Sequence, residues 1–183
     1  MKKVILVYGL IAGTIVGGLM LLTMPLWDQG IINFDNGELV GYTTMVVALS
    51  MVFFGIKSYR DNHAGGVITF WTGCKIGLMI TLVAGIMYAL AWEISYARMG
   101  ESFTKEMNEY YLNETMEEMK AEGASEKEMQ EARAEWANFA EMYKNPLIRF
   151  PVTLMEILPV GILITLASAG ILRNKAILPA TAH

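Results

Sequence analysis

Residues 4–27 read VILVYGLIAGTIVGGLMLLTMPLW and contain no charged side chain. At 1.5 Å per residue, a helix of about 24 residues is roughly 36 Å long, which is enough to cross a hydrocarbon core of about 30 Å with some tilt. The stretch is longer than the apolar region of a typical signal peptide, and no small-residue cleavage pattern follows it. We therefore expect a retained transmembrane helix that also serves as the insertion signal.

Three further apolar stretches cover residues 39–56, 67–97 and 150–172. In lipid, such a stretch satisfies its backbone polar groups within one segment only as a helix, and the sequence lacks the alternating pattern of barrel strands. The whole chain is 54% hydrophobic and 17% charged, whereas soluble domains are usually about 25% charged. The sequence predicts an all-α polytopic membrane protein, a single membrane domain over residues 1–183 with four transmembrane helices.

The charged residues divide the chain into two parts. Residues 98–149 contain 12 acidic and 7 basic side chains, a net charge of −5, and the remaining 6 acidic and 7 basic side chains give +1. Basic residues flank the predicted helices at Lys2 and Lys3, at Lys57 and Arg60, and at Arg173 and Lys175, whereas residues 28–38 hold three acids and no base. Because cytoplasmic loops collect Lys and Arg, we expect both termini in the cytoplasm and the 98–149 insert outside.

The insert is predicted to form two amphipathic helices. The break falls at residues 122–125, where Ser125 and Glu128 form a capping-box pattern. The second helix then places apolar residues at helical spacing on one face, namely Met129, Ala132, Trp136, Phe139 and Tyr143. Two interpretations remain open: the two helices bury their own stripes against each other, or part of the Met- and aromatic-rich face receives a partner or lies on the outer leaflet.

Three ionisable residues lie within the predicted spans. Glu156 falls about six residues, or roughly 9 Å, inside the outer end of the fourth span, and Glu93 and Lys75 lie 18 residues apart on one face of the third span. Intramembrane carboxyls are costly and usually face the bundle or water. The set is either a proton or cation path or a group of structural side chains. We expect the two acids near Arg98, Arg149 or each other.

Small residues recur at intervals of four on two predicted helices. Gly9, Gly13 and Gly17 form such a ladder on the first, and Gly73 and Gly77 repeat it on the third. These ladders let helix backbones approach closely in lipid. They serve either packing within one chain or the seam of a homodimer.

The residues that usually carry catalysis are scarce. His63, His183 and Cys74 are the only histidines and cysteine, so we expect no metal and no cofactor. The sequence has no phosphate-binding glycine loop and no serine–histidine–acid set, and its negative charge argues against nucleic acid. The cluster of Lys57, Tyr59, Arg60 and Asp61 is the only feature that suggests an enzyme acting on lipid, and positive-inside topology already accounts for most of it.

Five stretches resemble a bacterial family of uncharacterised membrane proteins, labelled domain of unknown function 4199. They are residues 8–13 (YGLIAG), 48–61 (ALSMVFFGIKSYRD), 65–70 (GGVITF), 75–81 (KIGLMIT) and 156–161 (EILPVG). The resemblance implies a four-helix inner-membrane protein with an outer helical insert between helices three and four. It also implies that Lys57, Tyr59, Arg60, Asp61 and Glu156 belong to recurring motifs, and it implies no activity or ligand.

Three functions remain as hypotheses. The leading one is a non-enzymatic accessory or scaffold protein of a bacterial inner membrane, whose acidic insert engages a protein partner or a second copy. The second is a small transporter or proton-coupled channel that uses Glu156 with Glu93 and Lys75. The third is a membrane-embedded enzyme that acts on lipid.

Overall fold

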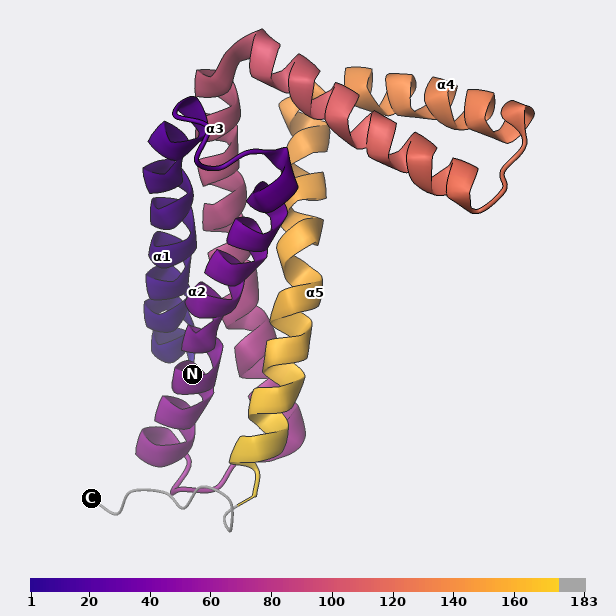
Figure 1. Ribbon diagram of the computed structural model, residues 1–183. Coiled ribbons are helices and arrows are strands. Elements are labelled where there is room, and N and C mark those ends of the chain that lie inside the picture. The colour runs from indigo at the N-terminus through magenta and orange to yellow at the C-terminus, as the bar shows by residue number, and fades with distance from the viewer. Residues whose placement is uncertain (175–183) are drawn as a thin grey trace. The chain divides into compact units, whose positions relative to one another are not determined.

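A computed structural model describes residues 1–174 of the chain as five α-helices (Figure 1). Their bounds are α1 (Lys2–Asp28), α2 (Phe34–His63), α3 (Phe70–Ala121), α4 (Glu126–Tyr143) and α5 (Pro146–Leu172). The predicted all-α class is therefore confirmed. Four of the five helices, all except α4, are long and apolar enough to cross a membrane, as the sequence predicts. Lys175 and His183 lie outside the described residues.

The chain divides into two compact units. Among the described residues, the first unit, which we call the bundle unit, contains residues 1–92 and 153–174, and the second, the hairpin unit, contains Glu93–Val152. Two helices belong to both units, because α3 leaves the bundle unit after Trp92 and α5 enters it at Thr153.

In the bundle unit the four apolar helices alternate in direction along the chain (Figure 1). The α1–α2 connection therefore lies at the same end of this unit as Trp92 and Thr153. Lys2, Arg60 and Arg173 belong to the opposite end, because each flanks a helix end on that side. The described basic flanks therefore share one end of the bundle unit, as an even number of crossings requires.

The glycine ladders lie at close contacts between helices of the same chain. A Cβ on Gly9 would fall 2.7 Å from the Cβ of Val83, and one on Gly17 would fall 3.2 Å from the Cβ of Ala91, so α1 packs closely on α3. In the α3–α5 contact, Gly77 faces Thr165 and Gly161 faces Thr81. Small residues on one helix thus receive larger ones from the next, which lets the helix backbones approach closely.

The bundle unit has an apolar core and an apolar surface. Leu49, Ile80 and Ile157 are completely buried in its centre. On the outside, Leu22 is 74% exposed and Leu163 is 69% exposed. A water-facing surface rarely carries such large apolar side chains in number, whereas a lipid-facing surface requires them. The exposed side chains therefore agree with helices that cross a membrane.

The hairpin unit begins with a change in direction of α3. Gly100 has φ +78° and ψ −178°, a backbone conformation that is almost restricted to glycine, and it breaks the helix between Met99 and Glu101. The predicted capping box at the start of α4 is confirmed, because the Ser125 side chain accepts from the Glu128 backbone N–H while the Glu128 carboxylate accepts from the Ser125 N–H. The sequence therefore predicted both the turn at residues 122–125 and the helix after it.

The start of α5 differs from the sequence expectation. The apolar stretch begins at residue 150, but the helix begins at Pro146, where proline suits the first helical position because its missing N–H would have no helical partner there. The side chain of Asn145 accepts a hydrogen bond from the Leu147 N–H at 3.0 Å and so caps the first turn. Because the hairpin unit extends to Val152, this first turn of α5 belongs to it.

Candidate functional site

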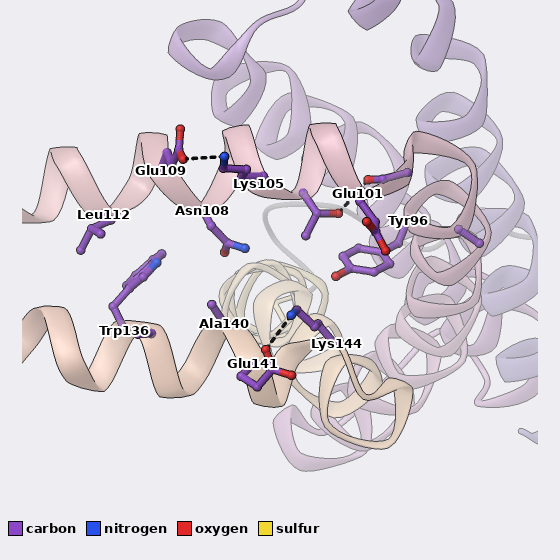
Figure 2. Close-up of a pocket in the computed structure, with 14 residues that line it drawn as sticks. Tyr96, Glu101, Lys105, Asn108, Glu109, Leu112, Trp136, Ala140, Glu141 and Lys144 are labelled. Atoms are coloured by element: carbon purple, nitrogen blue, oxygen red, sulfur yellow. Dashed lines mark hydrogen bonds and ion pairs between the residues drawn. The ribbon is translucent and has the colours of Figure 1, made fainter.

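The hairpin unit contains a cleft of about 710 Å³ between α3 and α4 (Figure 2). The α3 wall includes Tyr96, Gly100, Thr104, Asn108 and Leu112, which follow one another at intervals of four residues. Trp136, Ala140 and Lys144 form a similar row on the opposite wall. Residues four apart share one face of a helix, so each wall is one continuous face. The volume lies within the range of about 300–1,000 Å³ that is usual for ligand sites.

The two ends of the cleft differ in chemistry. Leu112 and Trp136 form an apolar end, and Figure 2 shows the Trp136 ring between the two helices. The Asn108 amide points between the helices midway along the cleft, opposite the small side chain of Ala140. Tyr96, Glu101, Glu141 and Lys144 surround the other end. A molecule that lies along the cleft would therefore contact an apolar surface at one end, an amide in the middle and charged side chains at the other end.

The indole N–H of Trp136 is a donor without an acceptor. Its Nε1 is buried and has no hydrogen-bond partner in the described part of the chain. A buried donor that loses its bond to water and gains no other costs about 1–3 kcal/mol. An oxygen acceptor that reached this nitrogen would remove that cost.

Carboxylates outnumber cations around the cleft, and both lysines lie beside glutamates. Lys105 Nζ lies 3.8 Å from Glu109, and Lys144 binds Glu141. The hydrogen bond that Lys144 donates to the Glu141 carboxylate raises the pKa of Lys144, and the charge of Glu101 acts in the same direction. The lining thus contains three glutamates and two lysines, which gives the cleft a net negative charge.

A buried arginine joins α5 to α3 at the base of the hairpin unit. Arg149 is 5% exposed, and its Nε donates to Glu93 Oε1 at 3.0 Å while its Nη2 donates to Glu93 Oε2. Its Nη1 also donates to the backbone oxygens of Tyr143 and Lys144, at 3.2 and 3.1 Å. The guanidinium carbon lies 3.7 Å from the centre of the Tyr96 ring, which also lines the cleft. Arg149 therefore fixes the ring at the charged end of the cleft.

The Arg149–Glu93 ion pair tests the expectation that Glu93 and Glu156 lie near an arginine or near each other. The expectation that Glu93 would lie near an arginine is confirmed for Arg149, whereas Arg98 is exposed. Glu156 instead accepts a hydrogen bond from the Tyr88 hydroxyl at 3.2 Å, and Glu38 on α2 is close enough to interact with it electrostatically. No ion pair involves Glu156 within residues 1–174.

Within residues 1–174, the three residues proposed for an ion path therefore make separate contacts and do not contact one another. Glu93 binds Arg149 in the hairpin unit, Glu156 contacts Tyr88 in the bundle unit, and Lys75 is exposed on α3. Glu156 is an exposed residue of α5, but the Tyr88 side chain that donates to its carboxylate is buried in the core of the bundle unit. The contacts of Glu93 are those of a structural side chain.

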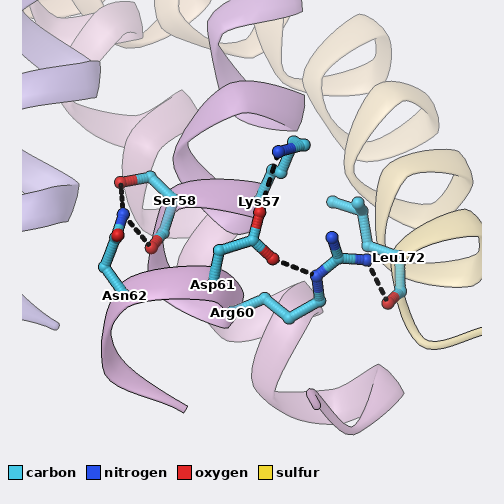
Figure 3. Close-up of polar contacts among 6 residues, drawn as sticks. All are labelled: Lys57, Ser58, Arg60, Asp61, Asn62 and Leu172. Atoms are coloured by element: carbon cyan, nitrogen blue, oxygen red, sulfur yellow. Dashed lines mark hydrogen bonds and ion pairs between the residues drawn. The ribbon is translucent and has the colours of Figure 1, made fainter. Parts of the chain in front are cut away.

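Polar contacts connect the residues of the basic cluster at the opposite end of the bundle unit, where Arg60 is buried and Lys57, Tyr59 and Asp61 are half-buried (Figure 3). Arg60 is 1% exposed, and it donates to Asp61 at 2.6 Å and to the backbone oxygen of Leu172 at 3.4 Å, near the end of α5. Lys57 donates to the other carboxylate oxygen of Asp61 at 2.8 Å. Tyr59 stacks on His63 with ring centres 5.6 Å apart. Arg60 thus connects α2 to α5 and presents little surface to a head group.

The apolar face of α4 is only partly covered. No residue of α4 is buried; Phe139 is 40% exposed and Met142 is 52% exposed. Trp136, Phe139 and Tyr143 form a row of ring contacts along the helix, with centres 6.2 and 5.6 Å apart. Of the five residues in the predicted stripe, four are half-buried and Phe139 is exposed, so the hairpin covers this face in part and leaves the remainder accessible.

Sequence reasoning missed the cleft because it searched for apolar stripes. The cleft walls mix glycine, alanine, threonine and asparagine with two aromatic rings, and such a mixture has no strong apolar periodicity. The intervals of four from Tyr96 to Leu112 and from Trp136 to Lys144 were present in the sequence. Only the pairing of the two helices shows that these rows face one another.

Comparisons with known proteins identify one family. A family model described as "Protein of unknown function (DUF4199)" matches residues 7–174. No curated protein and no solved structure matches the chain.

Proposed function

The family model covers most of the chain, so the chain belongs to the DUF4199 family, and we propose that it is a membrane-anchored scaffold whose hairpin unit binds a protein partner. The observation that supports this most directly is the open face of the hairpin. An amphipathic helix without a single buried residue lies beside a cleft of about 710 Å³. In the proposal, the bundle unit supplies the anchor and the hairpin unit supplies the binding surface.

We also propose an orientation in a bacterial inner membrane. The described basic residues at Lys2, Arg60 and Arg173 flank one end of the bundle unit, and the positive-inside rule assigns that end to the cytoplasm. The hairpin unit, which follows the opposite end of the third span, then lies outside the cytoplasm. Cysteine labelling tests this orientation in a Cys74→Ser background. A membrane-impermeant thiol reagent should label a cysteine placed at Ala134 in intact cells and should fail to label one placed at Asn62.

A pull-down from solubilised membranes tests the scaffold proposal. The intact chain is compared with a chain that lacks residues 98–149, after size-exclusion chromatography has shown that both are monodisperse. We expect the intact chain to recover at least one protein that the shortened chain does not. Recovery of the same proteins by both chains would contradict the proposal.

A second variant protects the test against misfolding caused by the deletion. Replacing Glu101 and Glu141 together by glutamine removes two exposed charges at the cleft without shortening the chain. We expect this variant to recover less of any protein that depends on residues 98–149. An unchanged yield with the glutamine variant would place the binding surface away from the cleft.

A further inference from the structure

We infer that the cleft of the hairpin unit binds a basic peptide segment of the partner, one that carries an apolar anchor side chain. This inference rests on the proposed function, because it specifies what the hairpin unit recognises. The shape of the cleft, its unsatisfied donor and its charge each favour such a segment.

The apolar end of the cleft fits a single large apolar side chain. Leu112 and Trp136 lie on opposite walls, so a side chain between them would contact both the leucine and the indole ring. Trp136 is itself only partly buried, so the anchor would cover indole surface that is now accessible. Tryptophan side chains that a partner buries completely commonly carry much of the binding energy of an interface.

The polar groups beside this end match a peptide backbone. The buried Nε1 of Trp136 has no acceptor within the residues that the structure describes, and a backbone carbonyl oxygen would supply one. The Asn108 amide, which points between the helices, offers both a donor and an acceptor, as a peptide group does. An extended segment could thus bond to both residues while its anchor side chain occupies the apolar end.

Charge complementarity selects a basic segment. Three glutamates and two lysines line the cleft, and the insert of residues 98–149 carries a net charge of −5. Lys105 and Lys144 each pair with another glutamate, so Glu101, whose charge acts on Lys144 only from a longer distance, makes no direct ion pair among residues 1–174. Lysine or arginine side chains of the segment would meet carboxylates on both rims.

The same charge disfavours other occupants. The hairpin of a second copy would bring another −5 to the interface, and like charges at an interface lower affinity. Anionic lipid head groups would be repelled in the same way. A partner with lysine or arginine around an apolar side chain satisfies both the charge and the shape of the cleft.

The test measures binding of synthetic peptides to the full chain in nanodiscs of phosphatidylcholine. Three fluorescent peptides are compared by anisotropy: a lysine-rich peptide with a central tryptophan, the same peptide with glutamate at each lysine position, and the lysine-rich peptide with serine in place of tryptophan. Empty nanodiscs measure adsorption to lipid. We expect only the first peptide to bind the protein above the empty-disc level, and we expect added salt to weaken its binding.

Two matched variants locate the binding. Ala140→Phe fills the middle of the cleft, whereas Ala134→Phe makes the same change at an exposed position of α4 outside it. We expect Ala140→Phe to weaken binding about tenfold or more and Ala134→Phe to change it little. Circular dichroism and size-exclusion chromatography check that both variants keep the fold and size of the parent chain.

Four results would overturn the inference. In the first two, Ala140→Phe and Ala134→Phe bind the lysine-rich peptide equally well, or the glutamate peptide binds as tightly as the lysine-rich one. In the other two, the lysine-rich peptide binds the protein no more strongly than it binds empty nanodiscs, or the chain self-associates through the cleft and Ala140→Phe abolishes that self-association. Failure of the inference is distinguishable from failure of the proposed function. If the pull-down depends on residues 98–149 but is unaffected by Ala140→Phe, the scaffold proposal stands and the cleft proposal falls. If the pull-down does not depend on residues 98–149, the scaffold proposal falls.

Discussion

Replacing Arg149 by glutamine is expected to loosen the hairpin unit more than any exposed substitution in it. The guanidinium makes two hydrogen bonds to Glu93 and two to backbone oxygens at the end of α4, and only 5% of the residue is exposed. Its loss leaves the Glu93 carboxylate without its cation. Helix α4 has no buried residue and only 18 residues, and isolated helices of that length are marginal in water. Its stability therefore depends on such tertiary contacts.

The size of the effect follows from the burial of the ion pair. Removing one member of a buried pair costs about 3–5 kcal/mol, and Glu93 keeps 21% exposure of its side chain, so we expect the lower end, about 3 kcal/mol. Since each 1.4 kcal/mol is a factor of ten, hydrogen exchange of the α4 amides should accelerate roughly a hundredfold. The measurement uses mass spectrometry on the full chain in detergent.

Two controls separate the ion pair from a general effect of charge. Arg98→Gln removes an exposed arginine from the same unit and should leave exchange nearly unchanged. Glu93→Gln combined with Arg149→Gln should cost less than the sum of the single changes, because neither charge is then left alone. The reasoning is refuted if Arg149→Gln and Arg98→Gln change the exchange of α4 equally.

Three further predictions concern other contacts. Gly9→Leu should lower the thermal midpoint of unfolding in detergent, because overpacking the α1–α3 contact costs about 1–3 kcal/mol. Gly18→Leu is the control and should leave the midpoint unchanged, since no neighbouring atom lies within 4 Å of a Cβ placed there. Equal shifts for the two variants would contradict this prediction. Arg60→Gln should lower the same midpoint more than Lys57→Gln, because hydrogen bonds of charged groups are worth about 1.5–3 kcal/mol and Arg60, 1% exposed, binds both Asp61 and the Leu172 backbone, whereas Lys57, 32% exposed, binds Asp61; equal shifts would contradict this. The backbone N–H of Ser125 and, second, its hydroxyl donate to Glu128 and lower the pKa of that carboxyl, so their stabilisation is complete above the unfolded-state pKa and is lost as the pH falls through the folded-state pKa. Ser125→Ala keeps the backbone donor and removes the hydroxyl, so a carboxyl NMR titration should show the pKa of Glu128 rising part of the way to its ordinary value; an unchanged titration would contradict the contribution of the hydroxyl.

The fold was predictable because its main determinants are local. Apolar length identifies each membrane-spanning helix, and the capping box at Ser125 marks the start of α4 without reference to the rest of the chain. The site was less predictable because it depends on pairing between distant segments. Glu93 and Arg149 are 56 residues apart, and their charges alone allowed Arg98 as an equal candidate. The burial of Arg149 decided between them.

The basic motif illustrates the same limit. From sequence, Lys57 and Arg60 are equivalent positive charges beside a membrane span, and topology accounts for both. In the structure Lys57 stays partly exposed, whereas Arg60 is buried and binds the end of α5, 112 residues away. Periodicity assigns Arg60 to a helix face but does not show which segment packs on that face. The structural role of Arg60 could therefore be recognised only from the packing of α2 against α5.

Site-specific photocrosslinking in native membranes tests the central claim, that the hairpin unit binds a partner through its cleft, most directly. A photoreactive phenylalanine analogue replaces Lys105, an exposed residue of the cleft lining, or Lys127, an equally exposed lysine outside it, so that the probe does not fill the cleft itself. The account predicts a discrete adduct from position 105 whose crosslinked segment, identified by mass spectrometry, is rich in lysine and arginine around an apolar residue. Adducts of equal yield from both positions, or an adduct at position 105 with an acidic segment or with lipid alone, would contradict it.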